Sequence, residues 1–321
     1  MKKRIIRSVI LAFLWVGVGT DLSQAAQDNV RSLAGPWRFQ LDRSNTGIQD
    51  RWFERALPDK VRLPGTLPGQ GIGDEVTVDT KWTGGIVDKS WFTAPEYSKY
   101  RQPGNVKVPF WLQPDKYFVG PAWYQRDIDI PARWQGQRVV LTLERPHWET
   151  RVWVDGKEIG SNNSLSTPHE YDLGTRLTAG KHQLTIRVDN SLIVDVGVDS
   201  HSISDHTQGN WNGIAGELSL RATSPVWLED VQVYPTSLDG KFRVVAKIGN
   251  ATGVAGEGKL SVLYNRNANQ KKAAGLPPLK EIPVTWKVNG GTVEFDCSLP
   301  ESAVKLWDEF NPNLHLLTFR L

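Results

Sequence analysis

Apolar and polar residues alternate in short segments along most of this chain, and turn residues separate the segments. In residues 123–131, for example, Tyr124, Ile128 and Ile130 fall on one face, and Pro131 ends the segment. Because the side chains of a strand point alternately to its two faces, this period of two predicts half-buried β-strands. The same pattern recurs in residues 137–144, 150–160, 182–190, 241–250, 258–265, 281–288 and 291–299.

The spacing of these segments favours β-sandwiches over an α/β fold. No window of eleven or more residues carries a convincing helical period. Short strands separated by turn signals at this interval are typical of sandwiches. A boundary near Ser224 and Pro225 divides the strands into two sets. The sequence therefore predicts an all-β protein, with one sandwich over residues 27–224 and a smaller one over residues 225–321.

Residues 64–121 interrupt the alternation, because they are rich in glycine, proline and aromatic residues. A long irregular loop inside a compact domain is usually functional or disordered, and the aromatic content argues against disorder. We expect most of these aromatic side chains to be buried beneath the loop and some to face a ligand. They are Trp82, Trp91, Phe92, Tyr97, Tyr100, Phe110, Trp111, Tyr117 and Phe118.

Residues 1–26 have the three-part layout of a secretory signal peptide. Basic residues come first, an apolar run extends from about Val9 to Val18, and small residues precede Gln27. The run is short for a membrane span, although an uncleaved anchor is the alternative. We expect a bacterial Sec-type signal, a periplasmic or extracellular protein, and no membrane contact after cleavage.

Charge and composition narrow the choice of partners. Residues 1–26 carry four basic residues and one acidic residue, so their removal takes the formal charge of +3 to about zero. The basic excess is then an export feature, and we expect no nucleic acid partner. The single cysteine, Cys297, permits no internal disulfide. Fourteen tryptophans indicate either aromatic-rich cores or aromatic faces displayed for ligands such as sugars.

Residues 120–190 and 211–235 resemble the N-terminal region of glycoside hydrolase family 2, which includes β-galactosidases, β-glucuronidases and β-mannosidases. The resemblance rests on an aromatic-Tyr strand that ends in Pro131, a Trp and Gly-Gln turn, and the motifs VWVDGKEIG, TPHEYDL, VDN and WNGIAGELSLRATSP. It implies a jelly-roll-like, galactose-binding-like sandwich followed by an immunoglobulin-like sandwich. Trp153 and Tyr124, within these motifs, are also explained as ordinary sheet residues.

In that family, a catalytic pair of Glu residues lies on an α/β barrel that follows the two sandwiches. No barrel sequence precedes Leu321, so the resemblance assigns no catalytic residue, and we expect the second sandwich to lack its last strand. We therefore expect the non-catalytic N-terminal portion of an exported, retaining β-glycosidase, whose complete form hydrolyses O-glycosyl bonds. Its partners would be a β-linked glycan and the missing C-terminal barrel, with no cofactor.

A carbohydrate-binding module and a surface protein are the two alternative classes of protein. A free-standing carbohydrate-binding module needs a sugar site that is complete without the barrel, with several exposed aromatic residues in the loop at 82–118. A structural or adhesive surface protein would call for tandem repeats or an attachment signal, and the sequence shows neither. Binding of oligosaccharides distinguishes the module from the non-catalytic portion.

The polar residues 195–213 supply most of the candidate sugar-binding side chains. By the resemblance, this loop can reach the sugar at the cleavage point, and Asp205, His206, Asn210 and Trp211 are expected to face it. Carboxylate, imidazole and amide groups hydrogen-bond hydroxyls, and an indole stacks on a ring. The alternative for the same residues is an ordered loop that satisfies its own backbone.

Three further interpretations concern single residues and small clusters. Asn105 lies where some family members supply a sugar-contacting Asn, and a turn-forming Asn after glycine explains it equally well. A serine-hydrolase triad would need a Gly-x-Ser-x-Gly elbow, which does not occur in the sequence. No metal site is expected, since no recognised ligand spacing appears. The residues considered for the triad and the metal are Asp195, Asp199, Ser200, His201, Asp205 and His206.

Overall fold

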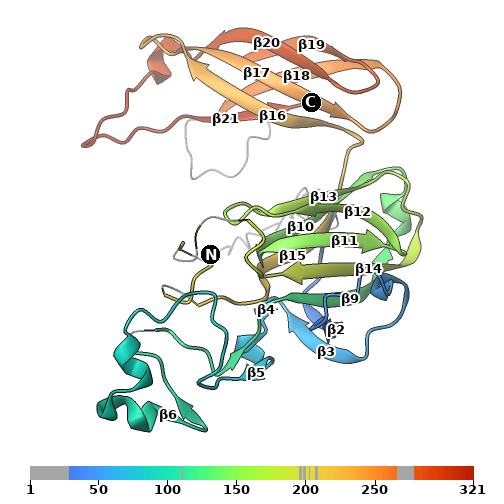
Figure 1. Ribbon diagram of the computed structural model, residues 1–321. Helices are drawn as coiled ribbons and strands as arrows, with labels where there is room; N and C mark the ends of the chain where they lie inside the picture. Colours follow the sequence, from blue (N-terminus) through green and yellow to red (C-terminus); the bar gives the residue numbers. More distant parts are fainter. Residues whose placement is uncertain are drawn as a thin grey trace, which may run out of the picture.

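The computed structural model describes residues 29–109, 111–194, 197, 200–201, 203–206, 209–265 and 278–321. The expected signal peptide, Phe110, Asp195 and Asp199 lie outside these ranges. Antiparallel strands dominate the described residues, which confirms the all-β prediction, and Figure 1 shows them gathered into two sandwiches. Within the described ranges, no helix has the length and apolar character needed to cross a membrane.

Two facing sheets form the first sandwich, in which chain-distant strands are paired. One sheet has the order β1 (Val30–Ser32), β15 (Gly213–Thr223), β10 (Arg138–His147) and β13 (His169–Gly174), with β4 (Gly65–Thr66) also pairing β15. The other has the order β12 (Lys157–Asn162), β11 (Glu149–Val154), β14 (Gly180–Asp189), β9 (Pro121–Ile130), β2 (Gly35–Leu41) and β3 (Asp59–Leu63). Such pairing brings loops from distant parts of the chain to one end of the sandwich.

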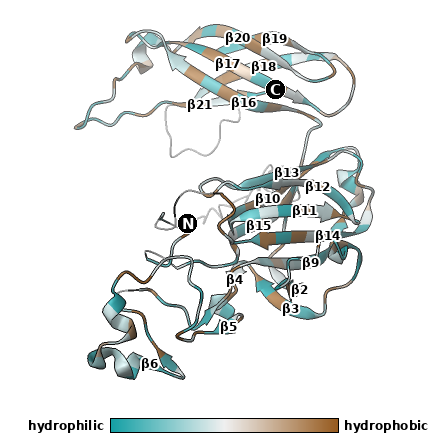
Figure 2. Ribbon diagram, in the orientation of Figure 1, coloured by the Kyte–Doolittle hydropathy of each residue, from teal (hydrophilic) through white to brown (hydrophobic). Residues whose placement is uncertain are grey.

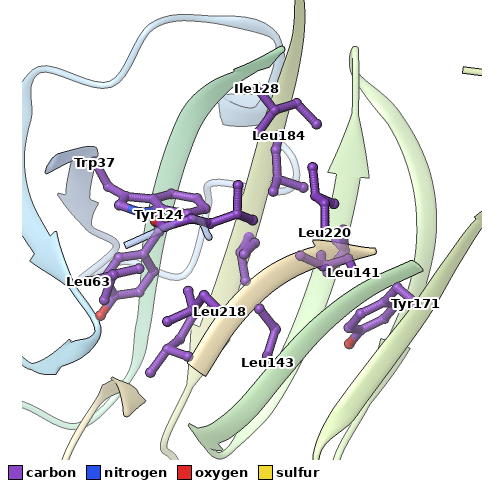
Figure 3. Packing of buried hydrophobic residues seen from close by; sticks show 14 of the residues in the cluster. Trp37, Leu63, Tyr124, Ile128, Leu141, Leu143, Tyr171, Leu184, Leu218 and Leu220 are labelled. Atoms are coloured by element: carbon purple, nitrogen blue, oxygen red, sulfur yellow. Dashed lines mark hydrogen bonds between the residues drawn. The ribbon is translucent and has the colours of Figure 1, made fainter. Parts of the chain in front are cut away.

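The core of this sandwich lies between the inner faces of its two sheets. Leu141 and Leu143 of β10 lie beside Leu218 and Leu220 of β15, and Tyr124 of β9 faces them from the other sheet (Figure 3). Each is 1% exposed or less. Burying a leucine side chain of this size contributes about 1.5–3 kcal/mol. The alternation predicted for residues 123–131 therefore places one face in the core.

The second sandwich is smaller and has two three-stranded sheets within the described residues. One sheet has the order β16 (Val226–Pro235), β17 (Lys241–Asn250) and β20 (Gly291–Ser298). The other has the order β19 (Lys280–Trp286), β18 (Gly256–Asn265) and β21 (Leu316–Arg320). Brown and teal residues alternate along β16 and β17 in Figure 2. That alternation places Val244 and Ile248 of β17 in the core, each 1% exposed or less.

A connection of two residues joins the sandwiches, since β15 ends at Thr223 and β16 begins at Val226. Beside it, the guanidinium of Arg138 lies 3.9 Å from the ring centroid of Trp227. The indole of Trp227 lies close against the backbone of Gly249, where an added Cβ would come within 2.3 Å of the ring. Arg138 also pairs with Asp172 at 2.8 Å, so the first sandwich holds the cation in place over the indole.

Residues 64–121 contain short ordered elements instead of one irregular loop. Besides β4, the short strands here are β5 (Asp74–Glu75), β6 (Arg101–Gln102), β7 (Asn105–Val106) and β8 (Lys116–Tyr117). The 3₁₀ turns in the described residues are η1 (Trp52–Glu54), η2 (Pro68–Gln70), η3 (Lys89–Phe92), η4 (Pro95–Tyr100), η5 (Ala132–Trp134) and η6 (Glu301–Ala303). Trp91, Val106 and Val108 form a separate small core, against which Trp82 and Trp111 pack.

Candidate functional site

Asp205 joins two loops at the end of the first sandwich. Its side chain is 2% exposed. Oδ2 accepts hydrogen bonds from the backbone N–H groups of Thr83 (2.7 Å) and Gly84 (3.2 Å) and from the Tyr117 hydroxyl (2.9 Å), and Oδ1 accepts one from the Asn210 N–H (3.1 Å). Burial and the Asp205 charge raise the pKa of Tyr117, so its hydroxyl stays protonated and donates. The carboxylate therefore uses its acceptors within the protein.

Asn210 extends this polar network toward the sheets. Its Nδ2 donates to Thr83 Oγ1 and to the Asn190 carbonyl oxygen, both at 2.9 Å. Its Oδ1 accepts a hydrogen bond of 2.8 Å from Asn190 Nδ2. Since Asn210 is 2% exposed and its amide is bonded on both sides, its geometry fits the loop-ordering alternative better than contact with a sugar.

Asn190 and Asn212 complete the network; both lie in the motifs VDN and WNGIAGELSLRATSP, but the sequence interpretation did not make them candidate sugar-binding residues. Asn190 Oδ1 accepts from the Gly120 N–H at 3.0 Å, and Asn212 Nδ2 donates to the Gly120 carbonyl at 2.9 Å. The Tyr124 hydroxyl donates to Asn212 Oδ1 at 2.8 Å. Their sequence signal is position, because one follows β14 and the other precedes β15. Amides at strand ends can bond backbone groups that the sheet leaves unpaired.

His206 stands beside the aromatic loop and packs against Trp111. Their ring centroids are 5.3 Å apart with an interplanar angle of 63°. Trp111 also meets Trp82 at 5.3 Å, with the two ring planes at 90°. A Cβ added at Gly84 would lie 2.5 Å from Cδ2 of His206, so glycine is needed for this close approach. His206 and Trp111 are both half-buried, and each keeps a surface toward solvent.

Trp211 and Asn105 lie in different surroundings from the buried network. The half-buried indole of Trp211 stacks on His147, with centroids 4.6 Å apart and planes at 26°, so His147 covers one of its faces. Asn105 is exposed on β7, and its Nδ2 donates to the Lys99 carbonyl at 2.6 Å. Gly104, with φ of 75°, turns the chain just before it, as the turn explanation requires.

Two cavities flank the segment that carries Trp111. One has a volume of about 320 Å³, and its lining includes Ile86, Asp88, Trp91, Pro109, Trp111 and His206. The other has a volume of about 470 Å³, and its lining includes Glu75, Asn105, Lys107, Trp111, Gln113 and Asp115. Trp111 thus borders both cavities, and each contains one candidate residue from the sequence.

The metal interpretation involves Asp195 and Asp199, which lie outside the described residues, and the serine-hydrolase interpretation involves Asp205. No group of three His, Cys, Asp or Glu side chains suited to a metal ion occurs among the described residues. The acceptors of Asp205 face Thr83, Gly84, Tyr117 and Asn210, which serves the loops and not a triad. What the site can do is hold aromatic surfaces and polar groups at fixed positions, the requirement for recognising a ligand.

Comparisons with known proteins agree on one family. The family profile described as "Glycosyl hydrolases family 2, sugar binding domain" matches residues 30–224. A β-glucuronidase of Paenibacillus borealis is 21% identical over 308 residues, which cover 91% of this chain and 42% of that protein. A β-galactosidase of Arthrobacter sp. (strain B7) is 32% identical over 166 residues, which cover 49% of this chain and 15% of that protein.

Solved structures show the same fold at low identity. The β-glucuronidase of an uncultured Clostridium sp. matches with a TM-score of 0.54 and 20% identity, covering 91% of this chain and 42% of its own. The Ruminococcus gnavus β-glucuronidase matches with a TM-score of 0.52 and 16% identity, covering 90% of this chain and 41% of its own. The chain thus spans less than half the length of each of these proteins.

Proposed function

Because the chain belongs to glycoside hydrolase family 2, we propose that it is the non-catalytic N-terminal portion of an exported, retaining β-glycosidase. The match of residues 30–224 to the family's sugar-binding domain carries this proposal. The named activities of the relatives, β-glucuronidase and β-galactosidase, support a β-linked glycan as the substrate class. The 42% coverage of the first relative supports a catalytic partner domain beyond the aligned region.

In this role, the first sandwich orders a loop-rich end for contact with glycan. The carboxylate of Asp205 and the amide of Asn210 fix the loops from the inside. Rigid loops cost little entropy when a ligand binds, which favours affinity. The second sandwich would support the catalytic domain, which would supply the two carboxylates of retaining hydrolysis.

The test of this proposal is an assay of the purified chain with nitrophenyl β-glucuronide, β-galactoside and β-mannoside. We expect no turnover above the buffer blank, because the catalytic carboxylates belong to the partner domain. The Paenibacillus borealis β-glucuronidase serves as the positive control for the glucuronide. Turnover by the purified chain that follows its concentration would contradict the non-catalytic assignment.

Export has a separate test. Expression of the full chain in a bacterium should give a periplasmic or secreted product that begins at Gln27, as read by intact mass and N-terminal sequencing. A product that keeps residues 1–26 in the membrane fraction would favour the uncleaved anchor instead.

A free-standing carbohydrate-binding module is the second candidate function. The two cavities that share Trp111 favour it, because their linings come entirely from the first sandwich. Such a module would bind glycan without help from another domain. Since Trp111 borders both cavities, a glycan bound in either one would contact it.

A further inference from the structure

We propose that Trp111 is the centre of a glycan-binding site for neutral β-linked oligosaccharides, with one pyranose ring lodged in each of the two cavities that it borders. This inference rests on the proposed function, since it locates and specifies the sugar contact of the same domain. Trp111 is not one of the five candidate residues from the sequence. The site proposed here is centred on Trp111.

The sizes of the cavities suit single sugar rings. Volumes of about 320 and 470 Å³ fall at the lower end of the range for small-ligand sites. Because Trp111 and Val108 line both cavities, sugar rings held in the two cavities would contact the same segment. This arrangement fits an extended oligosaccharide better than a monosaccharide, which would fill only one cavity.

Trp111 differs from Trp91, the other indole that lines the smaller cavity, in being available to a ligand. Trp91 is 1% exposed, and its Nε1 donates to the Lys107 carbonyl at 2.8 Å, so it belongs to the small core. Trp111 is half-buried and is held by ring contacts with Trp82 and His206. An indole fixed in this way presents a large apolar surface to the C–H face of a sugar without losing much side-chain freedom.

Polar groups in the linings are placed to receive hydroxyl groups. Asp115 and Asn105 are exposed at the larger cavity, and Glu75 there pairs with Lys116. Asp88 is the carboxylate of the smaller cavity. Carboxylates accept hydrogen bonds from neutral hydroxyls, and they repel a sugar that carries its own carboxylate.

The charge of Asp88 keeps this repulsion of acidic sugars in place throughout the neutral pH range. Hydrogen bonds from the Ser90 hydroxyl and backbone N–H lower the pKa of Asp88, so the group stays ionised through the neutral range. A uronic acid in the smaller cavity would therefore meet a fixed negative charge. We infer that the smaller cavity selects a neutral sugar ring, although several relatives are named as β-glucuronidases; Lys107 in the larger cavity leaves the charge there mixed.

The walls of the two cavities are held together by the buried network. Asp205 bonds the backbone at Thr83 and Gly84, and it directly precedes His206, which borders the smaller cavity. The segment after Gly84 continues into Ile86 and Asp88 of the same cavity. The network therefore sets the position of His206 against Trp111, and Asp205 acts in this site as a positioning residue.

Titration of the purified full chain tests the site, with tryptophan fluorescence and calorimetry as readouts. The probes are cellotetraose, β-1,4-mannotetraose and β-1,4-galactotetraose, together with glucose and glucuronate, which match in size and differ in charge. We expect saturable binding of at least one neutral tetraose, weaker binding of glucose, and no binding of glucuronate at concentrations where glucose binds. Trp111→Ala should weaken tetraose binding at least tenfold, whereas Trp307→Ala, a change in the 62% exposed indole of the second sandwich, should leave it unchanged.

Two further variants separate recognition from folding. Asp115→Ala should weaken tetraose binding several-fold without shifting the thermal midpoint, because Asp115 is exposed at the rim. Asp88→Asn should narrow the preference for neutral sugar over glucuronate, a readout that a purely structural role would not move. If Trp111→Ala lowers the thermal midpoint by several degrees, these two variants decide the question.

The outcomes assign failure to one proposal or the other. Unaltered binding in Trp111→Ala, or in both Asp115→Ala and Asp88→Asn, overturns the Trp111 site. Absence of binding to all three tetraoses by the unmodified chain also overturns it. None of these results changes the nitrophenyl assay, whose positive result would overturn the non-catalytic assignment instead.

Discussion

The two sandwiches follow the same alternation of apolar and polar residues, yet they close their cores to different extents. Among the described residues, the main cluster of the first sandwich has 26 buried hydrophobic side chains and four partly buried ones packed against it. The cluster of the second has six buried side chains and eleven partly buried ones. Alternation therefore predicts which face of a strand turns inward, while the elements that cover that face decide how completely it is buried.

The difference follows from the number of strands and from the edges. The first sandwich packs a five-stranded sheet against a six-stranded one, whereas each sheet of the second has three strands in the described part of the chain. There, β21 pairs with β18 and forms an edge of its sheet. Near that edge, an apolar groove of about 320 Å³ is bordered by Leu238, Leu306 and Trp307, which are 79%, 55% and 62% exposed.

The largest expected effect is a core truncation that compares the two sandwiches directly. Leu141→Ala should lower the free energy of unfolding by about 3 kcal/mol, because it opens a cavity at a side chain that is 0% exposed. Leu317→Ala on β21 should cost about 1 kcal/mol, because this side chain is only partly buried and its site can hydrate. Urea unfolding followed by tryptophan fluorescence measures both losses.

Leu238→Ala is the matched control, and it should leave stability nearly unchanged because the side chain is 79% exposed. Equal losses for Leu141→Ala and Leu317→Ala would contradict the difference in core closure. A large loss for Leu238→Ala would instead indicate that the apolar groove is covered in solution.

The next effect is local and concerns the buried carboxylate of the first sandwich. Asp205→Ala removes the acceptor for three backbone N–H groups, those of Thr83, Gly84 and Asn210. Hydrogen bonds to a charged group contribute about 1.5–3 kcal/mol each, so hydrogen exchange at these amides should become at least tenfold faster.

Asp239→Ala in the second sandwich is the control for Asp205→Ala. The side chain of Asp239 is exposed, and hydrogen bonds from Lys241 and Ser237 lower its pKa to about 2. Solvent screens such exposed pairs, so this change should alter neither amide exchange nor unfolding measurably. Unchanged exchange at Thr83, Gly84 and Asn210 in Asp205→Ala would contradict the role given to the network.

These contacts show which parts of the molecule the sequence could reveal. Residues 123–131 were predicted to form a strand that ends at Pro131, and β9 ends at Ile130, because alternation is a local property. The all-β class and the family resemblance are likewise confirmed. The proposed division of the chain near residue 224 stays a prediction.

The candidate site was less predictable, because its geometry depends on contacts between distant residues. Asp205 bonds the backbone of Thr83, 122 positions away, and no local pattern indicates that pairing. The sugar-facing role of the five candidate residues stays a prediction. Trp111 was one of nine aromatic residues in a loop, and only the cavities on its two sides distinguish it.

A pH effect of intermediate size should appear in the first sandwich. His169 is 0% exposed, and burial lowers its pKa. Its Nδ1 lies 2.6 Å from Thr150 Oγ1 and its Nε2 lies 2.8 Å from the Ser164 carbonyl, contacts that suit the neutral ring. The unfolded state then binds the proton more readily, so this contribution to stability is present above about pH 6.5 and is lost as the pH falls below it.

Urea unfolding at pH 7 and pH 5 measures this loss, and His169→Gln should reduce it. His182 provides a comparison of opposite sign, because burial lowers its pKa but hydrogen bonds to Asp155 and the Thr178 carbonyl outweigh that effect and raise it. Its contribution is full at pH 5 and is lost as the pH rises through its raised pKa. An unaltered pH dependence in His169→Gln would contradict the assignment to His169.

The smallest expected effect tests whether the two sandwiches unfold as one unit. The Arg138 guanidinium lies 3.9 Å from the Trp227 ring centroid, an arrangement that contributes about 1 kcal/mol when partly desolvated. Arg138→Ala should remove that coupling and the pair with Asp172, so that the unfolding of the second sandwich moves to lower urea concentration. Arg138→Lys keeps the charge but loses the planar stack. Its transition for the second sandwich should therefore lie between those of the unmodified chain and Arg138→Ala. If Arg138→Ala shifts neither transition, the short connection between β15 and β16 must itself account for any coupling between the sandwiches.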